Sequence, residues 1–271
     1  MFAFPLSLMA FSSYPILNID VAFIPEEVCV SDIGDKAVLI IDILRATSTI
    51  TTAIANGASF LIPVDTPSEA FNLYEKLNRE PLLGGEVEGK LIKGFHLGNS
   101  ASEYTESLVK NKPIIIRTTN GTRAVNICSS ARHLVIGCFL NQSSSCHFLS
   151  KLGSDILIVC SGKEGKLGIE DVVFAGACVN TVSQIVTSGI NKSDSAVAAE
   201  MLYLHCKSDI LQMLRNSEHG RYLINIGLSD DLALCAQVDT TTAVPIYRDG
   251  KIVNYPRIMK VKKITRIGYI F

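Results

Sequence analysis

The segment Asp42–Thr49, "DILRATST", places an acid, a base and three hydroxyls directly after an apolar run. A carboxylate such as Asp42 is a ligand that Mg²⁺ prefers, and the guanidinium of Arg45 can hold a phosphate through two parallel hydrogen bonds. Hydroxyls and free N–H groups at a helix start also favour an anion. An ordinary helix cap with an Asp–Arg ion pair explains the segment equally well. The three hydroxyl residues are Thr47, Ser48 and Thr49.

A long loop is expected over residues 86–104, "EVEGKLIKGFHLGNSASEY". Glu86 begins the loop, and Asn99 and Ser100 end it before an expected helix. Loops of this length inside a compact domain are usually functional or disordered. Because apolar residues recur along this one, we expect it to be ordered and to contribute to a binding site.

The segment 118–124, "TTNGTRA", is dense in hydrogen-bond donors. Asn120 and Gly121 can fold backbone N–H groups into a concave anion site, and Thr119 and Thr122 add hydroxyls. An ordinary turn is the alternative, since Asn-Gly pairs are common in turns. Alone, this segment is a weak phosphate signal.

The segment 161–176, "SGKEGKLGIEDVVFAG", begins with Ser161 and Gly162 after another apolar run. Glu170 and Asp171 then open a long predicted helix. Acidic residues there either complement the positive end of the helix dipole or bind Mg²⁺. The residues alone leave both options open.

Two residues in the last quarter of the chain complete the candidate set. His219 precedes a glycine at an expected helix start, and Asp239 lies just before a predicted strand. A lone histidine is more often structural than catalytic, so His219 becomes a candidate only if it reaches the other polar segments.

The apolar pattern predicts strands alternating with helices, which indicates an α/β protein with a largely parallel sheet. We expect a layered α/β/α fold, with two α/β subdomains divided near residues 130–150 as a variant. Loops that follow parallel strands meet at one edge of the sheet, where ligands bind. The expected strands are 19–24, 37–41, 59–64, 81–85, 113–119, 133–137, 155–160, 242–247 and 251–255. The expected helices are 49–56, 66–77, 122–130, 142–152 and most of 169–216.

The composition bounds the class of protein. The 271 residues are 48% hydrophobic and 19% charged, with a formal net charge of −1. A near-neutral chain offers no bulk field for nucleic acid or anionic lipid, so we expect neither as a partner. Eight cysteines without a CxxC pair match no zinc pattern and favour a reducing, cytoplasmic setting. A homodimer is expected only from its general frequency.

The first 17 residues are apolar but carry no Lys or Arg, so the charged region of a signal peptide is missing. The stretch is also short for a transmembrane helix and is interrupted by two prolines. We expect residues 1–17 to form a loosely attached extension, followed by one domain over 18–271.

Five ordered motifs resemble the 2-phosphosulfolactate phosphatase family: "RATST", "GGE…GF.LGNS", "TTNGT.A", "C.G…ED…AG" and "HG…L…G…D…C…D….VP". The resemblance runs from about Ile19 to about Tyr247. It implies a Mg²⁺-dependent α/β phosphatase that releases phosphate from 2-phosphosulfolactate, giving sulfolactate on the route to coenzyme M.

The resemblance also implies site residues, position by position. The acidic matches are Asp42, Glu86, Glu170, Asp171 and Asp239. The phosphate-side matches are Arg45, Thr47, Ser48, Asn99, Ser100, Thr119, Asn120, Gly121 and Thr122, and His219 matches the late histidine. Thr49, Ser161 and Gly162 join the substrate-binding candidates from their place after the strands.

Three positions depart from the family pattern. Val87 stands where the family usually has arginine, His96 replaces an aspartate, and Ala101 replaces a proline. If that arginine grips the second anionic group of the substrate, the substrate of this chain differs.

The resulting hypothesis is phosphoryl transfer by positioning and electrostatics. Carboxylates from Asp42, Glu170 and Asp171, with Glu86 and Asp239 as further candidates, would hold Mg²⁺. Arg45 and residues 118–122 would neutralise the developing charge, and His219 or a carboxylate would protonate the leaving alkoxide. The alternative is a protein that binds a phosphorylated metabolite without turnover.

Overall fold

A computed structural model describes residues 16–77, 79–187 and 189–255 of the chain. In this part, eleven strands form one mixed sheet in the order β5-β4-β6-β3-β11-β10-β7-β2-β8-β1-β9. The strands are β1 (Leu17–Ala22), β2 (Ala37–Ile41), β3 (Phe60–Val64), β4 (Leu82–Val87), β5 (Lys90–Leu91), β6 (Pro113–Arg117), β7 (His133–Gly137), β8 (Ile156–Cys160), β9 (Ile190–Lys192), β10 (Pro245–Arg248) and β11 (Lys251–Asn254).

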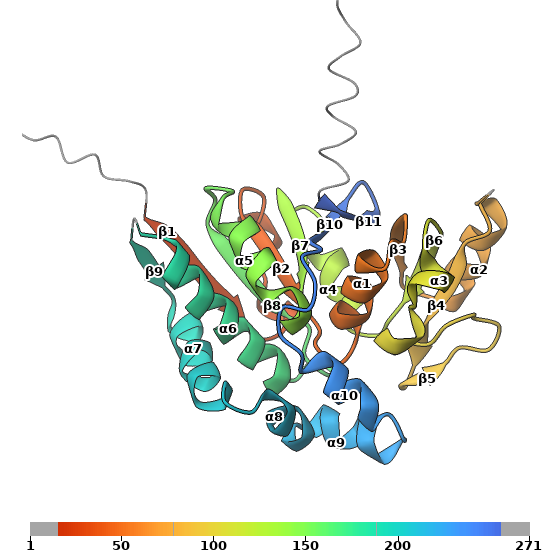
Figure 1. Cartoon of the computed structure of the whole chain (residues 1–271). Coiled ribbons are helices and arrows are strands. Elements are labelled where there is room, and N and C mark those ends of the chain that lie inside the picture. Colours follow the sequence, from red (N-terminus) through yellow and green to blue (C-terminus); the bar gives the residue numbers. More distant parts are fainter. Residues whose placement is uncertain (1–15, 78, 188, 256–271) are drawn as a thin grey trace, which may run out of the picture.

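Helices cover both faces of this sheet, so the expected layered α/β class with a largely parallel sheet is confirmed (Figure 1). The helices are α1 (Ala46–Ala55), α2 (Pro67–Lys76), α3 (Glu106–Val109), α4 (Gly121–Ile127), α5 (Gln142–Ser150), α6 (Ile169–Ile185), α7 (Asp194–Cys206), α8 (Ile210–Asn216), α9 (Glu218–Asn225) and α10 (Ser229–Cys235). Four 3-10 turns are η1 (Pro25–Glu27), η2 (Val30–Asp32), η3 (Ala101–Glu103) and η4 (Phe139–Asn141).

Strand β2 shows why the sheet is buried on both sides. All five of its residues are buried, as expected for a central parallel strand with a continuous apolar run. Leu39 and Ile41 pack into the core formed with α5 and α6. Val38 and Ile40 point to the other face and pack with α1 and α4. The alternation therefore joins two cores through one strand.

The sheet has two parallel parts joined by a hairpin. In one part β7, β2, β8, β1 and β9 are parallel, and in the other β4, β6 and β3 are parallel. Between them lies the antiparallel β10–β11 hairpin, seen in blue at the top of Figure 1. It pairs with Leu134 and Val135 near the start of β7 and with Leu61 near the start of β3. The hairpin therefore bridges the amino ends of the two parts and leaves their carboxyl ends to meet elsewhere.

Two strands, 37–41 and 133–137, match their predicted bounds, and the others differ by a few residues. The predicted cap of α2 is confirmed, because the hydroxyl of Thr66 accepts the N–H of Glu69 at 3.1 Å. Helix α1 begins three residues earlier than predicted, at Ala46, whose N–H is accepted by the Asp42 carboxylate at 3.2 Å. The segment 169–216 forms α6, α7 and α8, with β9 at the expected break.

The expected extension over residues 1–17 lies outside the described residues, apart from its last two. The division near 130–150 stays a prediction. Among the helices described, none is both long and apolar enough to cross a membrane.

Candidate active site

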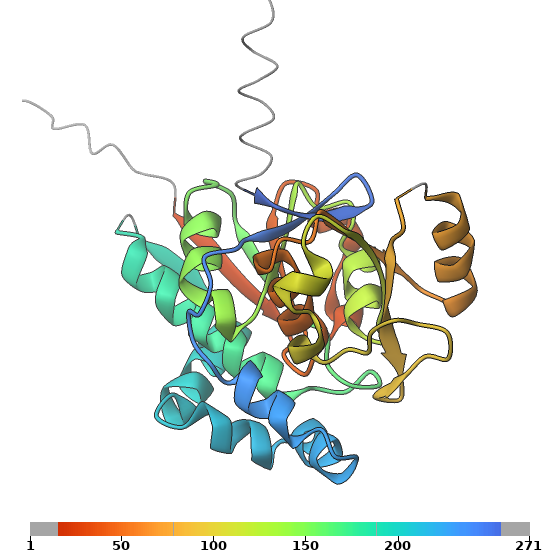
Figure 2. The same cartoon turned by 45° about the vertical axis from the view of Figure 1, so that its right-hand side comes forward.

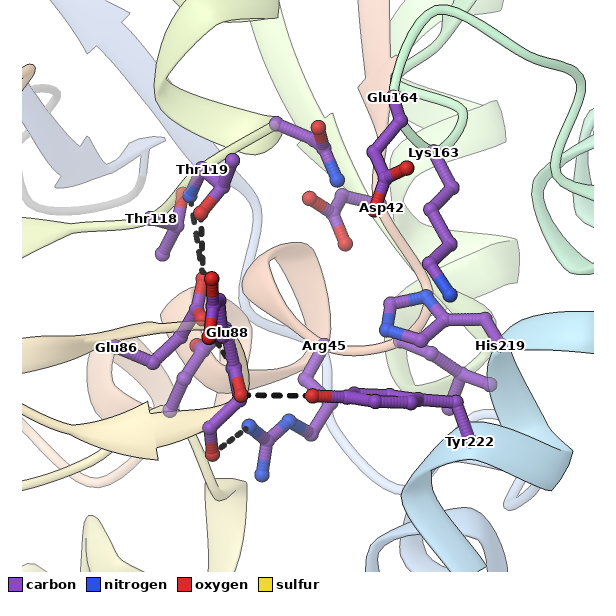
Figure 3. Close-up of a pocket in the computed structure, with 14 residues that line it drawn as sticks. Asp42, Arg45, Glu86, Glu88, Thr118, Thr119, Lys163, Glu164, His219 and Tyr222 are labelled. Carbon is purple, nitrogen blue, oxygen red and sulfur yellow. Dashed lines mark hydrogen bonds between the residues drawn. The ribbon is translucent and has the colours of Figure 1, made fainter. Parts of the chain in front are cut away.

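The carboxyl ends of both parts of the sheet open into one cavity of about 380 Å³. Asp42 follows β2, Glu86 is the last residue but one of β4, Thr118 follows β6, and Lys163 lies in the loop after β8. Figure 3 shows Thr118 and Thr119 on one side and Lys163 and His219 on the other. The lining residues are Asp42, Leu44, Arg45, Glu86, Glu88, Gly89, Asn99, Thr118, Thr119, Asn120, Lys163, Glu164, His219 and Tyr222.

Asp42 is held between two helix starts. Its Oδ1 accepts the N–H of Ala46 at the beginning of α1. A Cβ atom added to Gly121, the first residue of α4, would lie 3.1 Å from Asp42 Oδ2 and 2.7 Å from the Ala46 Cβ. Position 121 therefore has no room for a side chain. Burial raises the pKa of Asp42 to about 6; nearby His219 lowers it, and Glu86 and Glu170 raise it further.

Arg45 is buried and its charge is already compensated. Its Nη1 forms an ion pair with Asp231 Oδ2 at 2.7 Å, and its Nη2 donates to the Gly89 carbonyl at 3.1 Å. The other carboxylate oxygen of Asp231 accepts the hydroxyl of Ser100. The Asp–Arg ion pair considered in the sequence thus exists, but its acid is Asp231 rather than Asp42.

The hydroxyl run after Arg45 does not line the cavity. Thr47 donates to the Asp42 carbonyl, Ser48 to the Ile43 carbonyl and Thr49 to the Asn99 carbonyl, each at 2.9 Å. The structure therefore places these three residues in the start of α1 and in its contact with the 86–104 loop, and not around a ligand.

Glu86 ties two segments together at the cavity wall. Its Oε1 accepts the N–H and the hydroxyl of Thr119, both at 3.2 Å, and its Oε2 accepts the N–H of Gly89 at 2.6 Å. The 86–104 loop and the end of β6 are thus held in register by one buried carboxylate.

The 118–122 segment forms the opposite side of the cavity in part. Thr118, Thr119 and Asn120 line it, whereas Thr122 is buried and its N–H is accepted by the Thr118 hydroxyl at 3.1 Å. The predicted anion site is therefore reduced to the first three residues, with Gly121 packed against Asp42 behind them.

Asn99 and Ser100 have separate positions. Asn99 lines the cavity, and its Oδ1 is buried without a hydrogen-bond partner in the described part of the chain. Ser100 bonds to Asp231. A buried oxygen beside a cavity that no protein donor reaches is available to a ligand, a water or an ion.

His219 lines the same cavity as the other polar segments, so it is a candidate catalytic residue. It lies in the first turn of α9, where the Ser217 hydroxyl caps the helix by accepting the Gly220 N–H at 2.9 Å. A Cβ atom at Gly220 would lie 1.8 Å from the Leu214 carbonyl oxygen, so only glycine fits after the histidine. His219 Nδ1 lies 3.4 Å from Glu170 Oε1.

Glu170 does not line the main cavity. It lines a smaller adjoining cavity of about 230 Å³, which shares Lys163, Glu164 and His219 with the main one. The His219–Glu170 contact therefore lies between the two cavities.

Asp171 holds two strand ends together. Its Oδ1 accepts the N–H of Ile43 at 2.8 Å and its Oδ2 the N–H of Gly162 at 3.0 Å. Burial raises the pKa of Asp171 well above its usual range, with Glu170 and Asp42 adding to the effect. Ser161, beside Gly162, is buried, and neither residue lines the main cavity.

Asp239 lies outside the site predicted for it. It is exposed, and its two carboxylate oxygens accept the N–H and hydroxyl of Ser143 at 2.7 and 2.6 Å. It lines neither cavity. The structure brings the other four predicted acids to the end of the sheet but leaves Asp239 at the start of α5, because an exposed aspartate satisfies the free N–H groups there.

Sequence reasoning missed Asp231, Lys163 and Tyr222. Asp231 is the aspartate of "HG…L…G…D" in the last family motif, so the motif could have pointed to this residue. Lys163 lies within the 161–176 segment, where a lone lysine between glycines carries no specific signal. Tyr222 lies one helical turn after His219, and the hydroxyl of Tyr222 donates to the Glu88 carbonyl at 2.9 Å.

The three departures from the family pattern do not line the cavity. Val87 is exposed at the end of β4, and Ala101 is buried. His96 accepts the N–H of Leu83 through Nδ1 at 3.0 Å.

The residues present fit Mg²⁺ only with help from other ligands. In the described ranges, no three His, Cys, Asp or Glu side chains gather closely enough to hold a metal ion. Mg²⁺, however, keeps several waters and commonly takes one or two carboxylates together with substrate phosphate oxygens. Asp42 Oδ2 has no hydrogen-bond donor among the described residues, and Asn99 Oδ1 has none either. These two oxygens suit such a partial ligand set.

Comparison with known proteins agrees with the geometry. Residues 22–250 match the family described as 2-phosphosulpholactate phosphatase. Two relatives, both named "Probable 2-phosphosulfolactate phosphatase", come from Symbiobacterium thermophilum and Caldanaerobacter subterraneus subsp. tengcongensis. They are 37% and 38% identical over 82% and 81% of this chain, and over 95% and 90% of their own lengths. A third, from Clostridium acetobutylicum, bears the same name and is 34% identical over 88% of this chain and its own whole length. The chain therefore belongs to the 2-phosphosulfolactate phosphatase family.

Proposed function

We propose that this protein is a Mg²⁺-dependent phosphatase that hydrolyses the phosphate monoester of a small 2-hydroxy acid. The first candidate is 2-phosphosulfolactate, which would yield sulfolactate and phosphate. Family membership supports the phosphatase chemistry. The observation that carries the proposal is the placement of Asp42: a desolvated carboxylate at a strand end that faces a cavity with donor groups on one wall and Lys163 and His219 on the other.

The phosphate is proposed to lie beside Asp42, against Thr118, Thr119 and Asn120. The donors of Asn120 and the hydroxyl of Thr118 would bind its oxygens, strengthened by the low dielectric of the cavity, while Thr119, whose N–H and hydroxyl are donated to Glu86, shapes the wall. If Mg²⁺ is bound, Asp42 and Asn99 would hold it, and the ion would neutralise phosphate charge and lower the pKa of bound water. Glu86 and Asp171 would act as positioning residues, since their oxygens already accept two or more backbone or hydroxyl donors.

His219 is proposed as the general acid. Water adds to phosphorus and gives up a proton to solvent, and the bond between phosphorus and the ester oxygen breaks. The leaving alkoxide takes a proton from the imidazole ring, which regains one from solvent. Glu170, whose Oε1 lies 3.4 Å from Nδ1, would orient the ring. Arg45 would contribute through the position of Ser100, because Asp231 already neutralises its charge. Attack by Asp42 itself, giving a phosphoaspartate, is the alternative route.

The test is phosphate release from a panel of 2-phospho acids, measured with Mg²⁺ and after treatment with a chelator. We expect release from 2-phosphosulfolactate that is lost with the chelator and restored by Mg²⁺. Activity that survives chelation would overturn the metal requirement. No release from any ester would instead favour the non-catalytic binder.

The proposal also covers the pathway, the cellular setting and the oligomeric state of the protein. A role in coenzyme M biosynthesis follows only if 2-phosphosulfolactate is the substrate. A reducing, cytoplasmic setting is supported by eight free cysteines, most of them buried. A homodimer rests on general frequency alone.

A further inference from the structure

The main cavity receives two positively charged side chains with different surroundings. Arg45 is buried and paired with Asp231 at 2.7 Å. For Lys163, the described residues include no carboxylate oxygen within 4.0 Å of Nζ. A cation without a carboxylate partner at the wall of a cavity can still bind an anion from solution. Lys163 is therefore the cation that the fold leaves available to a ligand.

A tight turn fixes the backbone position of Lys163. Lys163 and Lys166 exchange two backbone hydrogen bonds of 2.9 Å. Between them, Glu164 and Gly165 have φ values of 52° and 73°, as in the two-residue turns that close hairpins. The turn presents the Lys163 side chain to the cavity, and Figure 3 shows it running toward His219 and Tyr222.

An aromatic ring fixes the position of the Lys163 ammonium group. Its Nζ lies 4.7 Å from the centre of the Tyr222 ring, a distance at which a cation is attracted to the ring face. Tyr222 is itself anchored, because its hydroxyl donates to the Glu88 carbonyl at 2.9 Å. The ring contact holds the ammonium group without neutralising it, so its N–H donors remain free for an oxyanion.

The two walls of the cavity suit different groups of the substrate. Asp42, Thr118 and Asn120 serve the phosphate in the proposed function, and in Figure 3 Lys163 lies across the cavity from Thr118 and Thr119. A 2-phospho acid carries a further acid group two or three bonds from the ester oxygen, and that group must face away from the phosphate wall. Val87, at the end of β4, supplies no charge to receive it.

We infer that Lys163, positioned by Tyr222, binds the acid group of the substrate that is not hydrolysed, a carboxylate or a sulfonate. It thereby selects esters with a second negative charge. This inference rests on the proposed function for the place of the phosphate.

The test is calorimetric titration with sulfolactate, lactate and inorganic phosphate, which needs no turnover. In Lys163→Met we expect the Kd for sulfolactate to rise about 10- to 100-fold, while the Kd for phosphate stays within about twofold. An unchanged Kd for lactate assigns the sulfonate to Lys163, and a matching loss for lactate assigns the carboxylate. Lys163→Arg should restore most of the affinity.

Lys166→Met is the matched control, because Lys166 belongs to the same turn but lines only the smaller cavity. It should bind all three ligands as the wild type does. Equal losses for phosphate and sulfolactate in Lys163→Met, or no loss for either, would overturn the inference. Thermal unfolding of each variant separates a binding effect from a damaged turn. Failure of the proposed function would appear separately, as a wild type that binds sulfolactate but releases no phosphate.

Discussion

The cavity has a buried wall and an exposed rim, and the two are built differently. Asp42 and Arg45 line the buried wall, and Asp231, paired with Arg45, and Asp171, which accepts the N–H of Ile43, support it from behind. All four residues are less than 10% exposed. The rim consists of two tight turns, 87–90 and 163–166, which Tyr222 contacts from α9. On the wall, each carboxylate accepts at least one hydrogen bond from the protein. On the rim, Lys163 touches an aromatic ring and leaves its donors unused.

This difference indicates that the wall serves catalysis and the rim serves substrate selection. Groups that must keep one geometry during phosphoryl transfer gain from packing and from hydrogen bonds that lock their rotamers. Groups that only choose the substrate can lie on turns, where sequence changes cost little stability. Variants of the wall should therefore damage turnover or folding, whereas variants of the rim should change only which ester is accepted.

The largest effect is expected at Asp42. Asp42→Asn keeps the size of the side chain and the acceptor for Ala46 but removes the charge, so kcat/KM should fall by about 10³-fold or more. Phosphate release measures the loss, and circular dichroism checks the fold. Turnover within tenfold of the wild type would remove Asp42 from the centre of the mechanism.

Asp231 should matter through stability. Asp231→Ala leaves the Arg45 guanidinium buried without its partner, which typically costs about 3–5 kcal/mol. Urea unfolding measures this loss. Combining it with Arg45→Met removes the unpaired charge, so the double variant should recover part of the stability. A double variant no more stable than Asp231→Ala would mean that the ion pair is not the cause.

His219→Gln should reduce kcat by about 10²-fold while KM changes little, because the ring acts on the leaving oxygen. An ester of nitrophenol needs no general acid, since its leaving group is already a stable anion. The variant should therefore keep near wild-type kcat on that ester. An equal loss on both kinds of ester would contradict a general-acid role.

The raised pKa of Asp42 predicts a pH effect on folding. The native state keeps the Asp42 proton up to about pH 6, whereas the unfolded chain loses it near 3.8. Burial of Asp42 is therefore least costly below pH 3.8, and the free energy of unfolding of the wild type should fall relative to that of Asp42→Asn as pH rises from about 4 to about 6. Urea unfolding of both proteins at several pH values, without added metal, measures this difference. A constant difference would show that Asp42 is not desolvated.

The smallest effect is expected at Asp239, which lies on neither the wall nor the rim. Asp239→Ala removes the acceptor at the start of α5 and should cost about 1 kcal/mol of stability. Its kcat/KM should equal that of the wild type. A loss of Mg²⁺-dependent activity would contradict this and would support Asp239 as a metal ligand.

The fold was largely predictable because its signal is local. Continuous apolar runs such as 37–41 and 133–137 became strands with the predicted bounds, since burial on both faces leaves no other pattern. The β10–β11 pairing was also predictable from Asp249 and Gly250, the residues of a tight turn. What the pattern did not reveal was that this hairpin separates two parallel parts.

The site was predictable only in outline. Asp42 and Asn120 do line one cavity, because loops that follow parallel strands meet at one edge, and His219 reaches the same cavity from the first turn of α9. The hydroxyls of Thr47, Ser48 and Thr49 were ambiguous, since helix starts and phosphate sites use the same residue types. Asp231 lies 186 residues from Arg45 along the chain, so local spacing carries no sign of their ion pair.

The position of the β10–β11 hairpin has a consequence for how the chain folds as it leaves the ribosome. Strands β3 and β7 are synthesised long before residues 245–254, yet the hairpin fills the place between them. Until it arrives, each of the two parts exposes a row of unpaired backbone groups at its inner edge, and such edges invite association with other chains. We expect the nascent protein to be most prone to aggregation during the synthesis of its last helices, and completion of the sheet to be a late step.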